Sequence, residues 1–493
     1  LLCMRLANVF LVQTYIHPDE TWQSLEVAHR WAFGYGFLTW EWHHALRGCA
    51  HPMLFAAVYR LLALLRLDNT PLLLVAPYVL VALIAASVDY ATFHFARRIA
   101  GEQVAKWAVL CSAVSWSMGS GIVRPLVNSA ETCLTAAGLV FWPWKRSTAH
   151  SLPKALLFAS LSCIIRPTSG VVWLCAGLCL LVNQPRTGRI LRTLRIVKTA
   201  LMFGIGALAV MLVVDRLGYG QWVFPPYQFY VFNVQQDLAT WFGESPPLYH
   251  LYVSLPVLFT SMLPFVLHGT YLGYQRGIAE PGVVAVLASA VFSLVGHMEY
   301  RFLYPLLPIG FVYAAMSMQS LAGPLVRRIV AYLLLTNVPA TLYLNLVHQR
   351  GVIDVLSYLR RQPANDLTGI GFLMPCHSTP FYSHLHRNIP MWFLACEPPL
   401  DKSQLEAHYW EADDFEQRPA DFLNRIFADT TGRCDRHPRP GHWRLLPSHL
   451  VLYDNMAQRI RGTLKQLGYS EKKRFFNTHF EGDSRRKGDV VVY

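Results

Sequence analysis

The chain has 493 residues and a formal net charge of +13, and 53% of its residues are hydrophobic whereas only 15% are charged. Typical soluble proteins are about 25% charged. This composition excludes a cytosolic enzyme, a fibrous protein and a disordered chain, and it indicates a membrane protein.

The charges are unevenly distributed along the chain. Residues 351–493 contain 19 Lys or Arg and 17 Asp or Glu, whereas the 350 residues before them contain 24 and 13. We therefore expect a membrane domain over 1–350 and a soluble domain over 351–493. Basic residues between apolar runs are typical of cytoplasmic loops. A nucleic-acid-binding protein would gather them on one face, so no nucleic-acid partner is expected.

Ten apolar segments are long enough, or nearly so, to cross a bilayer. The first has no basic stretch or cleavage site before it, which indicates that the sequence begins in or just before a first membrane helix. Segment 153–183 is interrupted by Arg166-Pro167, where we expect a tight hairpin, because Pro removes a backbone donor and Arg is costly in hydrocarbon. The run 52–67 is short, which favours a tilted or re-entrant helix. The ten segments are 1–16, 71–96, 104–120, 128–144, 153–183, 197–215, 249–272, 282–297, 301–321 and 328–347.

The basic loops predict the orientation of these segments. Residues 97–106, 145–154, 186–198, 276 and 327–328 are placed on the cytoplasmic side. The loops 17–50 and 216–248, the turns around Arg124 and Arg166, residues 297–301 and the soluble tail then fall on the opposite side. The expected fold is an α-helical polytopic membrane protein with about eleven transmembrane helices.

Two regions outside the spans have recognisable patterns. The outer loop 17–50 is rich in Trp and acidic residues, which predicts an amphipathic helix in the membrane interface. The tail alternates apolar runs (369–374 and 489–493) with helical patterns (401–410 and 451–467). A small α/β domain is expected there.

The sequence His17-Pro18-Asp19-Glu20 follows the first apolar segment directly. A carboxylate at a membrane boundary is suited to act as general base on a hydroxyl, because partial desolvation raises its pKa towards the working range. Two alternatives stay open. The acids can occupy the first turn of a helix, where the dipole favours negative charge, or His17 and Asp19 can ligate a metal.

Several charged residues are expected on the same outer side. Arginines at a membrane boundary rarely lack a role, and Arg binds phosphate better than other anions. The alternative is structural pairing, of Arg301 with Glu299 and of Arg124 with Glu131. No phosphate-binding Gly-rich loop, Ser/His/Asp triad or Cys-x-x-Cys motif is present. The charged residues are Arg124, Glu131, Arg166, His297, Glu299 and Arg301.

Aromatic and amide side chains in the loop 216–248, including Gln221 and Trp222, suit sugar binding, but they are equally ordinary in an interfacial loop. In the tail, Cys376 and Cys396 are candidates for a disulfide in an oxidising compartment. Cys434 and Cys49 are competing partners. A zinc site made of Cys376, His377, His384 and His386 lacks the usual paired spacing.

Two stretches of the first outer loop have a familiar pattern. His17–Glu26 (HPDETWQSLE) and Tyr35–Trp42 (YGFLTWEW) resemble the first lumenal loop of the family 22 mannosyltransferases, which are GT-C-type membrane glycosyltransferases of the endoplasmic reticulum. The resemblance covers nearly the whole chain. Three later motifs, His348–Gly351 (HQRG), Met374–Pro380 (MPCHSTP) and Tyr382–His384 (YSH), resemble the branch that adds the third mannose to the GPI-anchor precursor.

The resemblance implies α-1,2-mannosyl transfer, with inversion, from dolichyl-phosphate mannose to a GPI lipid that bears two mannoses. It takes place on the lumenal side of the endoplasmic reticulum membrane, among that membrane's lipids. Asp19 matches the position of the family's general base, and Glu20 would orient the acceptor or assist. No cofactor or metal is expected, since the donor carries one phosphate.

The other expected roles rest on the predicted topology. The donor phosphate is assigned to Arg301 first, then His297, and then Arg124 and Arg166. Two alternative functions are a sister mannosyltransferase of N-glycan precursor assembly and a lipid or solute transporter. The expected acceptor-binding residues are His17, Trp22, Gln221, Trp222, Glu299 and Tyr300.

Overall fold

The computed structural model describes residues 1–321, 323–404, 408–427 and 446–493. The chain divides into two compact units. The helical unit contains Leu1–Leu11, Glu41–Phe55 and Val75–Leu342, and the sheet unit contains Val12–Trp40, Ala56–Leu74 and Tyr343–Tyr493. The predicted boundary near residue 350 is close to the division at 342/343, but the sheet unit also includes the predicted outer loop up to Trp40.

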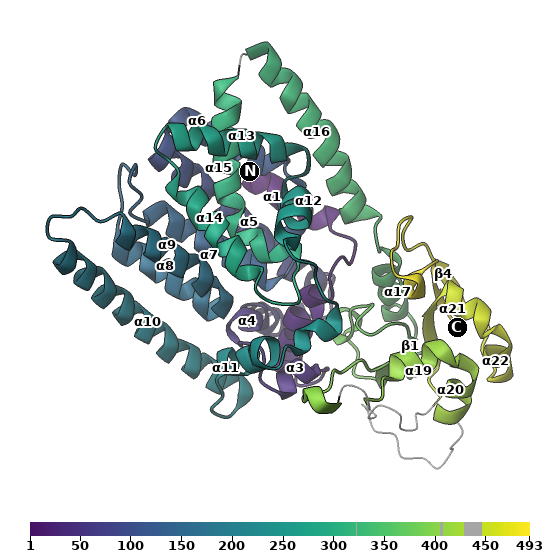
Figure 1. Ribbon diagram of the computed structural model, residues 1–493. Coiled ribbons are helices and arrows are strands. Elements are labelled where there is room, and N and C mark those ends of the chain that lie inside the picture. The colour runs from purple at the N-terminus through teal and green to yellow at the C-terminus, as the bar shows by residue number, and fades with distance from the viewer. Residues whose placement is uncertain (322, 405–407, 428–445) are drawn as a thin grey trace. The chain divides into compact units, whose positions relative to one another are not determined.

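The helical unit is built from apolar helices joined by short turns (Figure 1). Its α-helices, four of which extend into the sheet unit, are α1 (Leu2–Leu11), α3 (Trp40–His43), α4 (Ala50–Leu64), α5 (Leu72–Ala100), α6 (Glu102–Val114), α7 (Val127–Phe141), α8 (Leu152–Ile165), α9 (Gly170–Val182), α10 (Arg189–Tyr219), α11 (Pro225–Tyr230), α12 (Leu255–Phe259), α13 (Leu263–Gln275), α14 (Glu280–Phe292), α15 (Leu307–Ser320) and α16 (Gly323–Leu346). Turns of π-helix (117–121, 231–235 and 250–254) and 3₁₀-helix (167–169, 238–242, 260–262 and 300–306) connect or extend them.

In the described residues, five helical stretches are long and apolar enough to cross a membrane. They are Leu72–Ala100, Arg189–Tyr219, His250–Gln275, Tyr300–Ser320 and Gly323–Arg360, and shorter apolar helices include Leu2–Leu11, Ala50–Leu64 and Glu280–Phe292. A polytopic helical protein is therefore confirmed, while the count of eleven crossings stays a prediction. The predicted hairpin is confirmed too, because α8 ends at Ile165 and α9 begins at Gly170.

Two predicted boundaries in this unit are wrong. The first segment was expected to run to residue 16, but α1 ends at Leu11 and the Gln13 N–H donates to the Asn345 carbonyl instead. The basic run 186–198 was expected to be a loop, but α10 begins at Arg189 and continues without interruption to Tyr219. Arg and Lys are good helix formers, so the run extends the apolar helix that follows it.

Close helix packing depends on small residues, as is common in membrane bundles. A Cβ atom added at Gly269 of α13 would lie 1.7 Å from the carbonyl oxygen of Tyr313 in α15. Only glycine therefore lets these two helices approach to this distance.

A buried ion pair joins three helices of the helical unit. The Arg5 guanidinium donates to both carboxylate oxygens of Asp89, at 2.8 and 3.0 Å, and also to the Ser112 carbonyl. The Ser112 hydroxyl donates to Asp89 as well, at 2.6 Å. The side chains of Arg5 and Asp89 are 1% and 0% exposed, so each charge depends on the other for its neutralisation.

The sheet unit contains a five-stranded mixed sheet with the order β2-β1-β3-β5-β4. β1 is parallel to both β2 and β3, whereas β5 is antiparallel to β3 and β4. The α/β tail is thus confirmed. Its strands are β1 (Ile370–Leu373), β2 (Met391–Phe393), β3 (His449–Tyr453), β4 (Lys473–Phe475) and β5 (Val490–Val492), and its helices are α2 (Glu26–Phe33), α17 (Gly351–Arg360), α18 (Tyr382–Leu385), α19 (Glu411–Gln417), α20 (Pro419–Ile426), α21 (Asp454–Arg459) and α22 (Arg461–Gln466), with short helical turns at 21–25, 402–404 and 484–486.

Two predictions for the tail need correction. The helix expected over 451–467 starts later, because residues 451–453 belong to the buried strand β3. In the range 401–410, a short 3₁₀ turn covers Lys402–Gln404, and the next helix begins at Glu411. Residues 405–407, and with them part of this prediction, lie outside the described residues.

Both faces of the sheet are buried, and side chains alternate between them as the strand period requires. Leu450 and Leu452 pack with α19–α22. Val451 and Tyr453 face the other way and pack with α17 and with Tyr15 and Trp22 of the predicted outer loop. The predicted helix is present as α2, but Tyr15 and Trp22 of this segment cover the sheet, because the sheet offers an apolar face that needs burial. The placement of the segment in the membrane interface stays a prediction.

A carboxylate fixes this packing. Glu26, the first residue of α2, is completely buried, and it accepts hydrogen bonds from the backbone N–H groups of Phe381 (2.9 Å) and Ser383 (3.1 Å) and from the Ser383 hydroxyl. Burial raises its pKa from 4.5 to about 7, although these hydrogen bonds oppose the rise.

Asp89→Ala is expected to destabilise the helical unit by about 3–5 kcal/mol, because Arg5 would stay buried without its counter-charge. Thermal unfolding of the detergent-purified protein measures this loss. Glu102→Ala is the matched control, since it removes the exposed Glu102–Lys106 pair (3.5 Å), which is worth less than about 1 kcal/mol. Equal losses of stability in Asp89→Ala and Glu102→Ala would contradict a stabilising role of the buried Arg5–Asp89 pair.

Glu26→Gln is expected to flatten the pH dependence of stability of the sheet unit. Because the folded-state pKa of Glu26 is raised to about 7, the wild type is more stable below pH 4.5 and loses up to about 3 kcal/mol as the pH rises through 7. Unfolding followed from pH 4 to 8 measures this slope. The exposed acid Glu471, changed to Gln, should leave the slope intact, and an unchanged slope in Glu26→Gln would refute the prediction.

Candidate active site

The acidic motif forms the start of a helix in the sheet unit. The Trp22 N–H donates to the Pro18 carbonyl at 3.0 Å, and the Asp19 N–H donates to Nδ1 of His17 at 3.2 Å. The first-turn position that we considered as an alternative is therefore real, and it leaves the Asp19 side chain 19% exposed. A carboxylate at a helix start that still reaches the surface can both stabilise the helix and accept a proton.

Glu20 has a different environment from its neighbour. Its side chain is completely buried, and it accepts hydrogen bonds from the backbone N–H groups of Ile16 (2.9 Å) and His17 (3.2 Å). These bonds fix the bend that brings the chain into the helix. Of the two acids, only Asp19 keeps an exposed part of its side chain.

Trp22 does not have the position expected of an acceptor-binding residue. Its side chain is 3% exposed, its indole Nε1–H donates to the Thr379 carbonyl at 3.0 Å, and its ring lies 4.5 Å from that of His377. The physical reason is the π-helical turn over 21–25, which directs the indole into the core beneath the sheet. π-Helical turns often occur beside functional residues.

The tail motifs surround this acidic segment within the sheet unit. The Tyr15 hydroxyl donates to the His377 carbonyl at 3.0 Å, Trp22 bonds to Thr379, and Glu26 bonds to the backbone of residues 381 and 383. Burial lowers the pKa of His377 to about 4, so its ring is neutral at pH 7. MPCHSTP and YSH thus hold the loop that carries Asp19.

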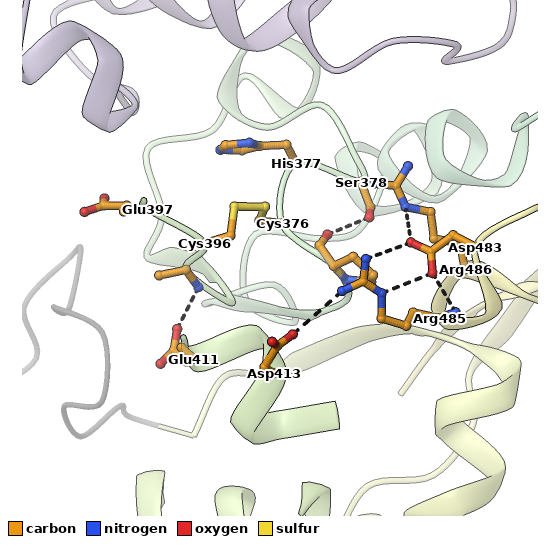
Figure 2. Close-up of a disulfide and its surroundings, with 12 residues drawn as sticks. Cys376, His377, Ser378, Cys396, Glu397, Glu411, Asp413, Asp483, Arg485 and Arg486 are labelled. Carbon is orange, nitrogen blue, oxygen red and sulfur yellow. Dashed lines mark hydrogen bonds and ion pairs between the residues drawn. A yellow bond between two sulfur atoms is a disulfide. The ribbon is translucent and has the colours of Figure 1, made fainter. Parts of the chain in front are cut away.

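The predicted disulfide between Cys376 and Cys396 is present (Figure 2). Each cysteine follows the end of a strand by three residues. Because β1 and β2 are parallel neighbours, their ends lie side by side, and this brings together two cysteines that are 20 residues apart. Both sulfur atoms are used, so the alternative zinc site lacks its thiolates, and Cys49 is a free cysteine. Cys434 lies outside the described residues.

The cationic residues gather in the helical unit around the start of the 3₁₀ turn 300–306. Arg301 is 5% exposed and donates to both oxygens of Glu299, at 2.6 and 2.7 Å. Its third nitrogen lies 3.4 Å from Oδ1 of Asn128, whose amide donates to the Arg301 carbonyl. The pairing of Arg301 with Glu299 that we considered is confirmed.

The second pairing that we considered is wrong. Glu131 is completely buried, but it pairs with Arg166 at 2.8 Å and accepts from the Ser169 hydroxyl at 2.6 Å. Arg124 instead donates to the Ser120 carbonyl. The hairpin at 166–169 brings Arg166 towards α7, and this contact between two helices is not visible in the local sequence around Glu131.

His297 and Tyr300 flank the Arg301–Glu299 pair. The His297 Nε2 atom lies 3.6 Å from Glu299, and its Nδ1 lies 2.8 Å from the Gly243 carbonyl. The hydrogen bond to Glu299 raises the pKa of His297, against the effect of burial. The ring of Tyr300 lies 6.3 Å from Trp116. His297, Glu299 and Arg301 therefore form one charged group.

Gln221 and Trp222 lie just beyond the end of α10, and both are exposed. The Trp222 ring is 71% exposed and has the Arg216 guanidinium 5.9 Å above it. These side chains are accessible, as a sugar-binding or interfacial role requires.

Sequence reasoning missed three contributors. Glu26 was noted only as an acidic residue of the outer loop and as the last residue of the HPDETWQSLE motif, without a role of its own. Asn128 and Ser169 were not singled out, since single polar residues in apolar segments are common. Only the contact of Asn128 with Arg301 and that of Ser169 with Glu131 distinguish these two residues from other polar residues in apolar segments.

Comparisons with known proteins show the family to which the chain belongs. A model of the Alg9-like mannosyltransferase family matches residues 1–386. The chain is 39% identical to GPI mannosyltransferase 3 of Yarrowia lipolytica, over 99% of this chain and 95% of that protein. It is 34% identical to GPI alpha-1,2-mannosyltransferase 3 of Homo sapiens, over 100% of this chain and 85% of that protein.

The fold also has a counterpart among solved structures. ArnT from Cupriavidus metallidurans, bound to undecaprenyl phosphate, superposes with a TM-score of 0.61 at 11% identity, covering 100% of this chain and 96% of that one. This similarity confirms the GT-C-type membrane fold. The family match, which covers more than three quarters of the sequence, shows that the chain belongs to the Alg9-like mannosyltransferase family.

Proposed function

We propose that the protein transfers the third mannose, in α-1,2 linkage, from dolichyl-phosphate mannose to the two-mannose GPI-anchor precursor. The observation that carries the proposal is similarity along the whole chain, at 34–39% identity, to proteins named GPI mannosyltransferase 3 and GPI alpha-1,2-mannosyltransferase 3. A structural relative that binds undecaprenyl phosphate supports a lipid-phosphate donor. The proposed location is the endoplasmic reticulum membrane, with the site on the lumenal side.

Asp19 is the proposed general base. Its carboxylate takes the proton from the acceptor hydroxyl while that oxygen bonds to the anomeric carbon of mannose. The bond from this carbon to the phosphate oxygen breaks on the opposite side, which inverts the anomeric centre and releases dolichyl phosphate. Partial exposure of Asp19 (19%) supports this role. Glu20 orients the motif through its bonds to residues 16 and 17.

Arg301 is the proposed ligand of the donor phosphate, with His297 as its neighbour. Arg301 is buried and already binds one oxyanion through two parallel N–H groups, which is the geometry that phosphate requires. The phosphate would replace Glu299 as the partner of Arg301, or would share the guanidinium with it. Arg166 ranks lower because its partner Glu131 is completely buried, whereas Glu299 is 21% exposed. Arg124 also ranks lower, because its guanidinium donates to the Ser120 carbonyl.

The remaining substrate contacts are assigned to side chains that are at least partly exposed. His17, Glu299, Tyr300, Gln221 and Trp222 are proposed to contact substrate, and Trp22 is not. The catalytic domain is proposed to extend over 1–350, with the lumenal domain over 351–493.

The test is mannose transfer by the purified full-length protein, supplied with dolichyl-phosphate mannose and a two-mannose GPI lipid, with and without EDTA. We expect an α-1,2-linked product in both cases. Transfer only to a dolichol-linked N-glycan precursor would favour the sister reaction. Lipid flux without transfer would favour a transporter, and inhibition by EDTA would contradict the metal-free reaction.

Asp19→Asn is expected to lower kcat by at least about 10³-fold, within the range for loss of a general base, while donor and acceptor KM stay within a few-fold. Initial rates with both substrates measure this. Asp366→Asn, an exposed acid of the same unit, is the control and should retain full activity. Turnover like that of the wild type in Asp19→Asn would remove the base assignment.

Arg301→Gln is expected to reduce kcat/KM for the donor by about 10²–10³-fold, because the leaving phosphate loses a charged donor. The acceptor KM should stay unchanged. The control is Arg327→Gln, which changes an exposed arginine of the same unit. If Arg301→Gln impaired the acceptor KM alone, the residue would belong to the acceptor site instead.

A further inference from the structure

The first turns of α10 have no evident role in the reaction. The helix has 31 residues, so it is about 46 Å long at about 1.5 Å per residue, whereas the hydrocarbon core of a bilayer is about 30 Å thick. Its apolar part follows Lys198, so most of the excess length is the segment Arg189–Lys198. This segment therefore extends through the lipid headgroup layer.

Arg189–Lys198 has two distinct faces. Arg189, Arg192 and Arg195 follow each other at intervals of three residues and are all exposed, with Arg186 before them and Lys198 after them. On the other face, four apolar side chains are exposed as well: Ile190 (79%), Leu191 (67%), Leu194 (60%) and Val197 (39%). A basic face beside an exposed apolar face suits the boundary between lipid headgroups and acyl chains.

The positive charge of this segment is not compensated by the protein. Residues 132–214 contain no Asp or Glu. None of the ion pairs in the described parts of the chain includes Arg186, Arg189, Arg192, Arg195 or Lys198. Within the described parts of the chain, the one hydrogen bond that these five side chains make is from Arg189 to the Leu181 carbonyl, at 3.4 Å.

The rest of α10 faces lipid too. It lies beside α8 at the edge of the helical unit (Figure 1), and only 6% of its most apolar stretch is buried within the protein. The open apolar face of 190–197 is therefore continuous with a surface that acyl chains cover.

We propose that Arg189–Lys198 is a binding surface for anionic phospholipids of the cytoplasmic leaflet. The apolar side chains enter the outer part of the acyl layer, and the three arginines bind headgroup phosphates through paired N–H donors. The basic loops place this end of α10 on the cytoplasmic side, where anionic lipids attract polybasic segments next to membrane helices. The proposal does not depend on which sugar acceptor the protein uses.

The test compares lipid binding to the delipidated full-length protein by native mass spectrometry, with phosphatidylinositol and phosphatidylcholine of matched acyl chains as probes. We expect the wild type to prefer phosphatidylinositol by at least about tenfold. The preference should fall as salt is raised from 50 to 500 mM, because exposed charges are screened. Equal binding of the two lipids by the wild type would by itself overturn the proposal. The basic residues would then serve to bind a protein partner or to orient the helix in the membrane.

The variant R189Q/R192Q/R195Q is expected to lose most of the preference, since each charge contributes about fivefold near an anionic surface. The control R276Q/R327Q/R328Q removes the same number of exposed basic residues elsewhere in the helical unit. It should retain the preference for phosphatidylinositol. R189K/R192K/R195K preserves the charges needed for membrane insertion and should keep binding within a few-fold. A preference that survives in the glutamine variant, or that the control variant loses equally, would overturn the assignment to α10.

Discussion

The buried carboxylate of Glu26 is the interaction on which the sheet unit depends. It satisfies backbone donors of Phe381 and Ser383 that lie some 350 residues later in the chain, and a buried donor without a partner costs about 1–3 kcal/mol. One side chain thus fastens the segment that carries Asp19 to the soluble tail. Trp22 strengthens the attachment by filling the space beneath the sheet and donating to Thr379. The acidic loop is therefore part of a packed domain and has a defined conformation.

The helical unit handles its charges differently. Asp89, Glu131 and Glu299 each hold an arginine, and in each pair at least one partner is almost completely buried. Inside a membrane protein an isolated charge is expensive, so pairing is a condition for the arginines to be there. The pairs differ in location. Arg5–Asp89 joins the inner parts of helices, whereas Arg301–Glu299 lies at the start of the 3₁₀ turn 300–306 that precedes α15, close to His297. The pair before α15 is also less buried, since Glu299 is 21% exposed whereas Asp89 is completely buried.

Short helices explain why apolar segments and helices correspond imperfectly. The segment 249–272 folds as a π-helical turn, two α-helices and a 3₁₀ turn, with a break at Thr260, where φ is +44°. Hydropathy averages over such breaks because every piece is apolar. It also cannot show that Arg189–Lys198 continues the helix of the following apolar run. Both the breaks and the extension depend on backbone hydrogen bonds, which composition does not report.

The sequence alone determined the membrane class, a small α/β tail, the hairpin at Arg166-Pro167 and the family, because these depend on composition, on proline and on motifs that are local in the chain. It offered Cys376–Cys396 as one of several possible disulfides, and the structure selected it. Only the tertiary structure decided which groups meet: Glu131 with Arg166 and not with Arg124, Trp22 with the sheet and not with the bilayer surface, and Glu26 with the YSH motif. Side-chain pairing between distant segments depends on how helices and strands pack, and a linear pattern of residue types leaves several pairings equally acceptable.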